Sequence, residues 1–286
     1  MPWTALEMSA RKFGMTATIS VRMALVSTKQ TQPDWLPSEE PGTVLARGRE
    51  VLLVESTAQF EGRAFDEKTW IDPTSNAAIQ IVDTETGVKN HRKVYRLLTS
   101  GFVLERREPA GATETTLPPQ LWSLVSRTRS TYSPAPPAGS VVTGALGLVC
   151  TVPADRLSAP GDRATFYVLV RDQLEEVVLA VDRVEPFQAE FVEEGASSRT
   201  QVNAPLDAVA ITVASRPLDA STGTMFRVFG LERSIRVVFE PTRRLPLQIT
   251  GQLGMIGQFT INLERVATRS PGAPPTAREN NSHLGK

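Results

Sequence analysis

The sequence contains few of the residues from which metal centres and nucleophilic active sites are built. Of its 286 residues, two are histidine and one is cysteine. The single cysteine, Cys150, cannot form an intramolecular disulfide, and burial in its apolar setting would leave the thiol unreactive. His283 lies in a polar C-terminal tail, so a histidine-dependent triad or metal centre would have to use His91. Since His91 falls in the polar run 89–93, we predict a solvated side chain there, no metal site and no catalytic residue.

An excess of charge of one sign and long hydrophobic runs are also absent. The chain has 31 Lys and Arg against 31 Asp and Glu, which gives no global attraction to nucleic acid or to anionic membranes. Its longest apolar run, 141–152, is interrupted by Thr143 and is far shorter than the roughly 20 residues of a membrane-spanning helix. The common nucleotide-binding loops and the Gly-x-Ser-x-Gly nucleophile turn do not occur. We therefore expect a non-enzymatic protein with no cofactor, no nucleic-acid partner and no transmembrane segment.

The clearest pattern that is present lies in the stretch 226–266, where three segments alternate apolar and polar residues with period two. Successive side chains of a strand point to opposite faces, so each segment predicts a strand with one buried and one wet face. The connector 241–244 and the turn at Gly254 are short, which predicts an antiparallel meander. The residues expected on its inner face are Ile235, Val237, Phe239, Leu247, Ile249, Phe259 and Ile261.

The same alternation predicts strands over most of the remaining chain. They are expected at 4–13, 15–26, 49–60, 63–71, 77–84, 91–99, 101–107, 163–171, 176–185, 187–193 and 207–215. The residues 83–87 predict a turn, because Asp and Thr side chains bond to the backbone there and a glycine follows. The segment 117–131 predicts a helix, because prolines precede apolar residues at helical spacing. The run 141–152 could be either a strand or a short helix.

Together these elements predict an all-β protein, a large curved antiparallel sheet in the form of a half-barrel or barrel-like meander with one short helix. Residues 1–267 would form a single β-rich domain, which the Pro-rich stretch 133–140 could subdivide. The stretch 193–205 is expected to be a polar loop, and 268–286 a disordered tail because it has so few apolar residues. The first residues carry neither the basic region nor the hydrophobic segment of a signal peptide, which fits a cytoplasmic protein or one whose signal has been removed.

Two segments carry a family resemblance. Residues 158–181 and 235–263, with a turn at Gly161-Asp162, the step Arg244-Leu245-Pro246, Gly254 and a final Leu263, resemble a bacterial periplasmic family classed as a domain of unknown function (number 3108). The resemblance covers roughly 120 residues, and the region before about residue 110 matches less clearly. It implies a periplasmic protein with an open, strongly curved antiparallel sheet. The family is distantly similar to the LolA and LolB lipoprotein carriers, whose concave apolar face holds acyl chains, and it brings no catalytic residues.

Two functions follow as hypotheses. In the first, the protein binds an apolar or lipid-like ligand on the concave face of its sheet, against the seven inner-face residues named above. A curved sheet with one apolar face must either fill its concavity with side chains or leave a cavity. In the second, the protein is a structural or accessory subunit that docks onto a larger protein complex through its sheet edges and loops. A continuous internal cavity would favour the first, whereas a filled core and an exposed apolar patch would favour the second.

Overall fold

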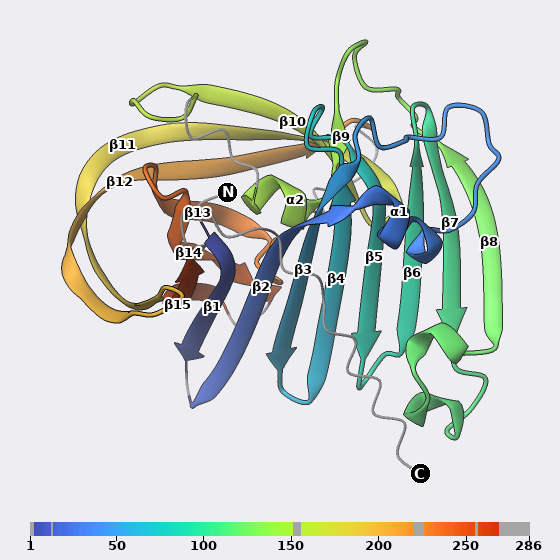
Figure 1. Cartoon of the computed structure of the whole chain (residues 1–286), viewed down its shortest axis with the longest axis horizontal. Coiled ribbons are helices and arrows are strands. Elements are labelled where there is room, and N and C mark those ends of the chain that lie inside the picture. The colour runs from blue at the N-terminus through green and yellow to red at the C-terminus, as the bar shows by residue number, and fades with distance from the viewer. Residues whose placement is uncertain (1–2, 13, 151–155, 220–225, 255–256, 269–286) are drawn as a thin grey trace.

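The computed structural model describes the whole chain except residues 1–2, 13, 151–155, 220–225, 255–256 and 269–286, and it is all-β (Figure 1). The first strands are β1 (Trp3–Lys12), β2 (Met15–Ser27), β3 (Glu50–Phe60), β4 (Arg63–Ile71), β5 (Ala78–Thr86), β6 (His91–Leu98), β7 (Gly101–Glu108) and β8 (Leu124–Thr131). The remaining strands are β9 (Val142–Thr143), β10 (Arg163–Val170), β11 (Gln173–Glu194), β12 (Arg199–Pro217), β13 (Arg233–Glu240), β14 (Leu245–Leu253) and β15 (Gly257–Thr268). The helices are α1 (Thr28–Thr31) and α2 (Ala145–Cys150), with short 3-10 turns at η1 (Gln32–Asp34), η2 (Glu114–Thr116) and η3 (Pro119–Leu121).

All fifteen strands belong to one sheet whose order places the first and the last strand side by side. The order runs β8-β7-β6-β5-β4-β3-β2-β1-β15-β14-β13-β12-β11-β10-β9, so β1 pairs with β15 in the middle of the sheet. Nearly every pairing is antiparallel, and short turns join many of the neighbouring strands; the parallel exceptions are β9 with β10 and β11 with β15. The predicted curved antiparallel sheet with a short helix is therefore confirmed.

One half of the sheet closes on itself and the other does not. Val192–Glu194 of β11 pair with Arg265–Ala267 of β15, so β11 to β15 form a ring; we call these strands the closed half. The strands β1 to β8 spread out as a broad sheet that ends at β8, and we call them the open half (Figure 1). β10 and the start of β11 fold back over β5–β7, where the Tyr95 hydroxyl donates to Asp172 Oδ1 at 3.0 Å. The concave face is therefore covered.

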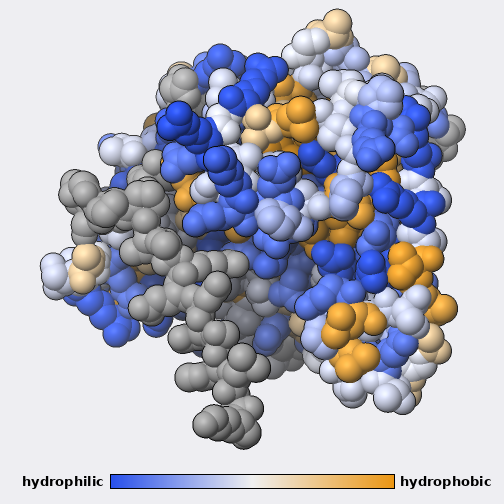
Figure 2. All heavy atoms as spheres, turned by 45° about the vertical axis from the view of Figure 1, so that its right-hand side comes forward, coloured by the Kyte–Doolittle hydropathy of each residue, from blue (hydrophilic) through white to orange (hydrophobic). Residues whose placement is uncertain are grey.

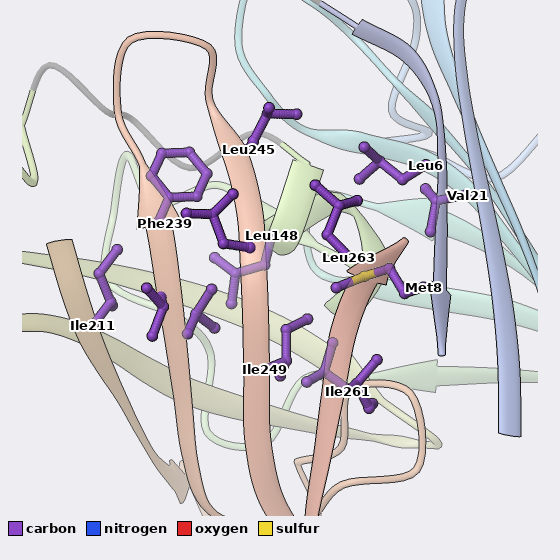
Figure 3. Packing of buried hydrophobic residues seen from close by; sticks show 14 of the residues in the cluster. Leu6, Met8, Val21, Leu148, Ile211, Phe239, Leu245, Ile249, Ile261 and Leu263 are labelled. Carbon is purple, nitrogen blue, oxygen red and sulfur yellow. The ribbon is translucent and has the colours of Figure 1, made fainter. Parts of the chain in front are cut away.

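The main core fills the space that this folding encloses (Figure 3). It combines the inner faces of β1–β4 and β10–β15 with Leu146 and Leu148 of α2, which lies inside the concavity. The two halves meet in it, as the rings of Phe60 on β3 and Phe259 on β15 pack edge to face with centroids 6.4 Å apart. The helix approaches the sheet closely because it has glycines: a Cβ at Gly147 would lie 2.9 Å from Ile71 Cδ1.

A second layer covers part of the opposite, outer face of the open half. The segment with α1 and η1 lies over β3–β6 and buries Trp35 against Trp70, Ile79 and Val94. The Trp70 indole donates to the Thr31 hydroxyl at 2.5 Å, which fixes the segment to β4. This face therefore has a buried end under α1 and a polar end beyond it.

The segment 117–131 is not the predicted helix. It contains η3 and then β8, which pairs with β7 along its whole length. Pro118 and Pro119 leave room only for a short 3-10 turn, and the Ser-Arg-Thr-Arg-Ser-Thr run that follows alternates at the period of a strand. The longer of the two helices is instead α2, inside the run 141–152 that the sequence left open.

Two predicted loops are also strands. β5 continues through the expected turn at 83–87 as far as Thr86, because residues 83–85 pair with residues 91–93 of β6. The expected polar loop 193–205 belongs largely to β11 and β12, and the separate strands 176–185 and 187–193 are one strand. The two arms pair with each other throughout, so their polar side chains reflect exposure rather than a loop. The predicted tail 268–286 lies outside the described residues except for Thr268, the last residue of β15.

Candidate functional site

The seven residues predicted on the inner face of the meander all lie in the main core. Figure 3 shows Phe239, Ile249 and Ile261 pointing into it together with Leu148 of α2. An apolar hollow beside them, lined by Leu148, Val237, Phe239 and neighbouring residues, has a volume of about 20 Å³. That is about the space of one water molecule. A lipid-like ligand at these residues would therefore require the packed side chains to move apart, and the apolar-ligand hypothesis stays a prediction.

A much larger hollow lies on the outer face of the open half. It is a polar groove of about 820 Å³ over β2–β6, between η1 at one end and η3 at the other. Strand register places its floor in two rows that run across the strands. The rows are Arg22, Glu55, Lys68 and Val82, and Ser20, Thr57, Asp66, Thr84 and Arg92. We call this feature the outer groove.

The charges of the outer groove are only partly paired. Lys68 Nζ lies 2.8 Å from Glu55 Oε1, and the Thr57 hydroxyl donates to Asp66 Oδ1 at 2.8 Å. The half-buried guanidinium of Arg92 has no hydrogen bond or ion pair with any described residue. Burial lowers its pKa, and the neighbouring Arg107 adds to that effect while Glu105 opposes it. Glu105 itself is held by Arg107 Nε at 2.8 Å and acts on Arg92 only through its charge, so the hydrogen-bond donors of Arg92 are available to an anion.

A pair of carboxylates occupies the concave face under α2. Glu67 of β4 and Asp83 of β5 lie directly opposite each other. Burial, and then the charge of Asp83, raises the pKa of Glu67 to about 7, although the Thr69 hydroxyl donates to Glu67 Oε1 at 3.3 Å. Burial also raises the pKa of Asp83, while His91 and Lys93 lower it. Both carboxyl groups therefore hold a proton more readily than they would in water, because burial and the like charge of the neighbour disfavour the ionised form.

The structure changes the interpretation of His91 and keeps that of Cys150. His91 is half-buried at the start of β6 rather than fully solvated, and burial lowers its pKa. Burial, and then the charge of Glu67, raises the pKa of the Cys150 thiol, which is unfavourable for a nucleophile. Among the described residues, no three His, Cys, Asp or Glu side chains are grouped so that they could hold a metal ion. Within the same part of the chain, no helix is long and apolar enough to cross a membrane.

The free edge of the open half is the third feature. In the described chain β8 is a terminal strand of the sheet, and most of its residues are exposed. Four exposed apolar residues gather in and just before it, with exposed fractions of 42–60%: Leu117, Leu121, Leu124 and Val125. Figure 2 brings this side forward and shows hydrophobic residues at its lower right among hydrophilic ones. We call these four residues and β8 the β8 edge.

Comparisons with known proteins give no relative. No family model matches the chain, and no curated protein or solved structure matches it. The resemblance to the periplasmic family and its lipoprotein-carrier relatives thus stays a prediction, as does the compartment.

Sequence reasoning missed the outer groove and the β8 edge for different reasons. Alternation marks Thr57, Asp66 and Thr84 as facing one side of their strands, but only the register brings them into one row. The β8 edge was missed because Leu121, Leu124 and Val125 fall at helical spacing, which predicted a helix instead of a strand.

Proposed function

We propose that this protein is a non-enzymatic interaction module, an accessory subunit that takes up an extended segment of a partner protein along β8. The observation that carries the proposal is the combination of a filled core with a long, free and two-sidedly exposed edge strand. A terminal strand presents unpaired backbone N–H and C=O groups, and these are the groups that bind an added strand.

Few side-chain contacts hold β8 in place besides its pairing with β7. Arg127 donates to the Pro37 carbonyl at 2.6 Å, and Arg129 Nη1 lies 2.9 Å from Glu40 Oε2. A strand is normally stabilised by burying at least one face, and β8 buries neither. A partner that covered Leu124 and Val125 would supply this missing burial.

The charges on β8 favour an acidic partner segment over a second copy of this chain. Arg127 bonds to a carbonyl and not to a carboxylate, so its charge is uncompensated. In a two-fold antiparallel pairing of two β8 strands about Thr128, Arg127 of one copy would lie opposite Arg129 of the other. Like charges directly opposite destabilise a strand pair, whereas Asp or Glu there would stabilise it. The expected partner segment is therefore extended, with acidic residues facing the arginines and apolar residues at the Leu124 end.

Selection from a displayed library of random peptides tests the proposal. We expect the selected peptides to carry acidic residues at every second position and to add a strand at β8. Their binding should raise the hydrogen-exchange protection of the β8 amides. Val125→Asp and Arg127→Glu should each weaken binding about tenfold or more. The matched controls are Val184→Asp, whose side chain is 48% exposed against 49% for Val125, and Arg183→Glu; both lie on β11 and should bind normally.

Three results would contradict the proposal. The first is a library that yields no binder, and the second is a set of peptides that bind both β8 variants as tightly as the unmodified protein. The third is a dimer of the protein that Arg127→Glu strengthens. An apolar ligand that co-purifies at one-to-one stoichiometry, and is lost in a Phe239→Trp variant that fills the inner hollow, would instead support the concave-face hypothesis.

A further inference from the structure

A second recognition surface is independent of the β8 edge. We propose that the outer groove binds an acidic oligosaccharide that lies across the strands, with a carboxylate on Arg92 and hydroxyl groups on the two polar rows. Nothing in this proposal depends on β8 having a partner, since the groove lies over β2–β6.

The anion-binding end of the groove is defined by Arg92. This side chain is half-buried and has no ion pair or hydrogen bond within the described part of the chain. A partly buried charge without a hydrogen-bonded partner lowers stability, because the charge of Glu105 offsets only part of the hydration that Arg92 loses. Arg107 lies directly opposite Arg92 on β7. It is bonded to Glu105 and to the Gln120 carbonyl, so neither of these acceptors is bonded to Arg92. The free guanidinium fork therefore matches a carboxylate of the ligand.

The body of the groove is suited to hydroxyl groups. Ser20 and Thr84 offer hydroxyls that donate and accept. The Thr57 hydroxyl, which donates to Asp66, can still accept, and Asp66 accepts at its second oxygen. Trp70 and Val82 in the floor are only 4% and 6% exposed, so apolar side chains of a ligand would find no exposed surface there. The backbone groups of the floor are used in strand pairing, which leaves side chains to do the recognition.

Length and charge select the oligosaccharide over other polar ligands. Four strand spacings of about 4.8 Å separate β2 from β6, so the groove is about 19 Å long, which exceeds a single sugar ring. Apart from Glu67, whose carboxyl group is buried beside Thr69 and α2, the charged residues that line the groove balance, with Arg22, Lys68 and Arg92 against Asp34, Glu55 and Asp66. A nucleic acid carries one charge per phosphate and needs a strongly basic surface. A chain rich in hydroxyls and sparse in carboxylates fits this balanced surface better.

An array of acidic and neutral oligosaccharides, followed by calorimetry of the full-length protein with the strongest binder, tests the proposal. We expect oligosaccharides that carry a uronic acid among neutral sugars to bind and their wholly neutral counterparts to bind at least about tenfold more weakly. Arg92→Met keeps the apolar stem and should weaken binding about ten- to a hundredfold without loss of folding, checked by circular dichroism. The matched control is Arg106→Met, on the strand next to Arg92 but on the opposite face, which should bind normally.

The proposal is overturned if no acidic oligosaccharide on the array binds, or if Arg92→Met binds it as tightly as the unmodified protein. Tighter binding of oligothymidylate or oligoglutamate than of any acidic oligosaccharide would also overturn it, because it would assign the groove to a nucleic acid or an acidic peptide. Loss of peptide binding at β8 leaves these results unchanged, so the two proposals fail separately.

Discussion

The closed half and the open half of this sheet are made from the same kind of strand but use their faces differently. In the closed half one face of each of β13–β15 is buried around α2, and the hollow beside it holds about one water molecule. In the open half β2–β6 carry a polar groove of about 820 Å³ on the outer face, and β8 is exposed on both faces. The closed half thus encloses apolar side chains, and we propose that the strands left open provide a surface for recognition.

Truncating the core should give the largest difference between the halves. Phe239→Ala removes a side chain that is 2% exposed in the closed half, and should lower the free energy of unfolding by about 3–5 kcal/mol. Ser20→Ala, in the outer groove, should change it by about 0.5 kcal/mol or less. Urea unfolding measures both values. Similar losses at the two sites would mean that the core around Phe239 and the outer groove do not differ in how they contribute to stability.

The carboxylate pair should make stability depend on pH. The pKa of Glu67 is about 7 in the folded protein and lower, at its ordinary value of 4.5, in the unfolded chain, and the pKa of Asp83 is shifted in the same direction. Between these values the folded state binds more protons, so stability falls as pH rises from about 5 to 7. Glu67→Gln should remove much of this decrease and stabilise the protein at pH 8 by on the order of 1–3 kcal/mol. Asp66→Asn, a neighbour on the outer face, serves as the control in urea titrations at several pH values.

The pH prediction has a clear contrary outcome. If unfolding free energies of the unmodified protein stay level or rise between pH 5 and 7, Glu67 is ionised in the folded state, and the concave face is wetter than its packing indicates.

The smallest expected effect concerns the outer groove. Arg92→Met removes a half-buried charge with no partner among the described residues, and should leave the free energy of unfolding unchanged or raise it by up to about 1 kcal/mol. The gain would show as a higher urea midpoint at constant slope. A loss of more than about 1 kcal/mol would mean that Arg92 serves stability rather than ligand binding.

The comparison of the halves also explains what the sequence could predict. The meander β13–β15 was predicted closely, because strict alternation with short turns leaves one arrangement for residues such as Ile235 and Phe259. The closure of β11 onto β15 was not predicted, since three residue pairs between distant segments leave no local pattern. β8 was mistaken for a helix because an edge strand with two exposed faces lacks the buried stripe that identifies a strand. The surfaces proposed for recognition thus lie where the local sequence pattern is weakest.

Hydrogen exchange of the full-length protein, resolved to single amides by NMR, would show whether β8 is a free edge while β14 is part of the core. The account predicts that β14 amides exchange only through unfolding on the scale of the whole protein, while β8 amides that point away from β7 exchange at nearly unprotected rates. The β8 amides bonded to β7 should open with a free energy well below that of β14. Equal protection along β8 and β14 in the isolated protein would contradict the account, because the edge proposed for partner binding would already be covered.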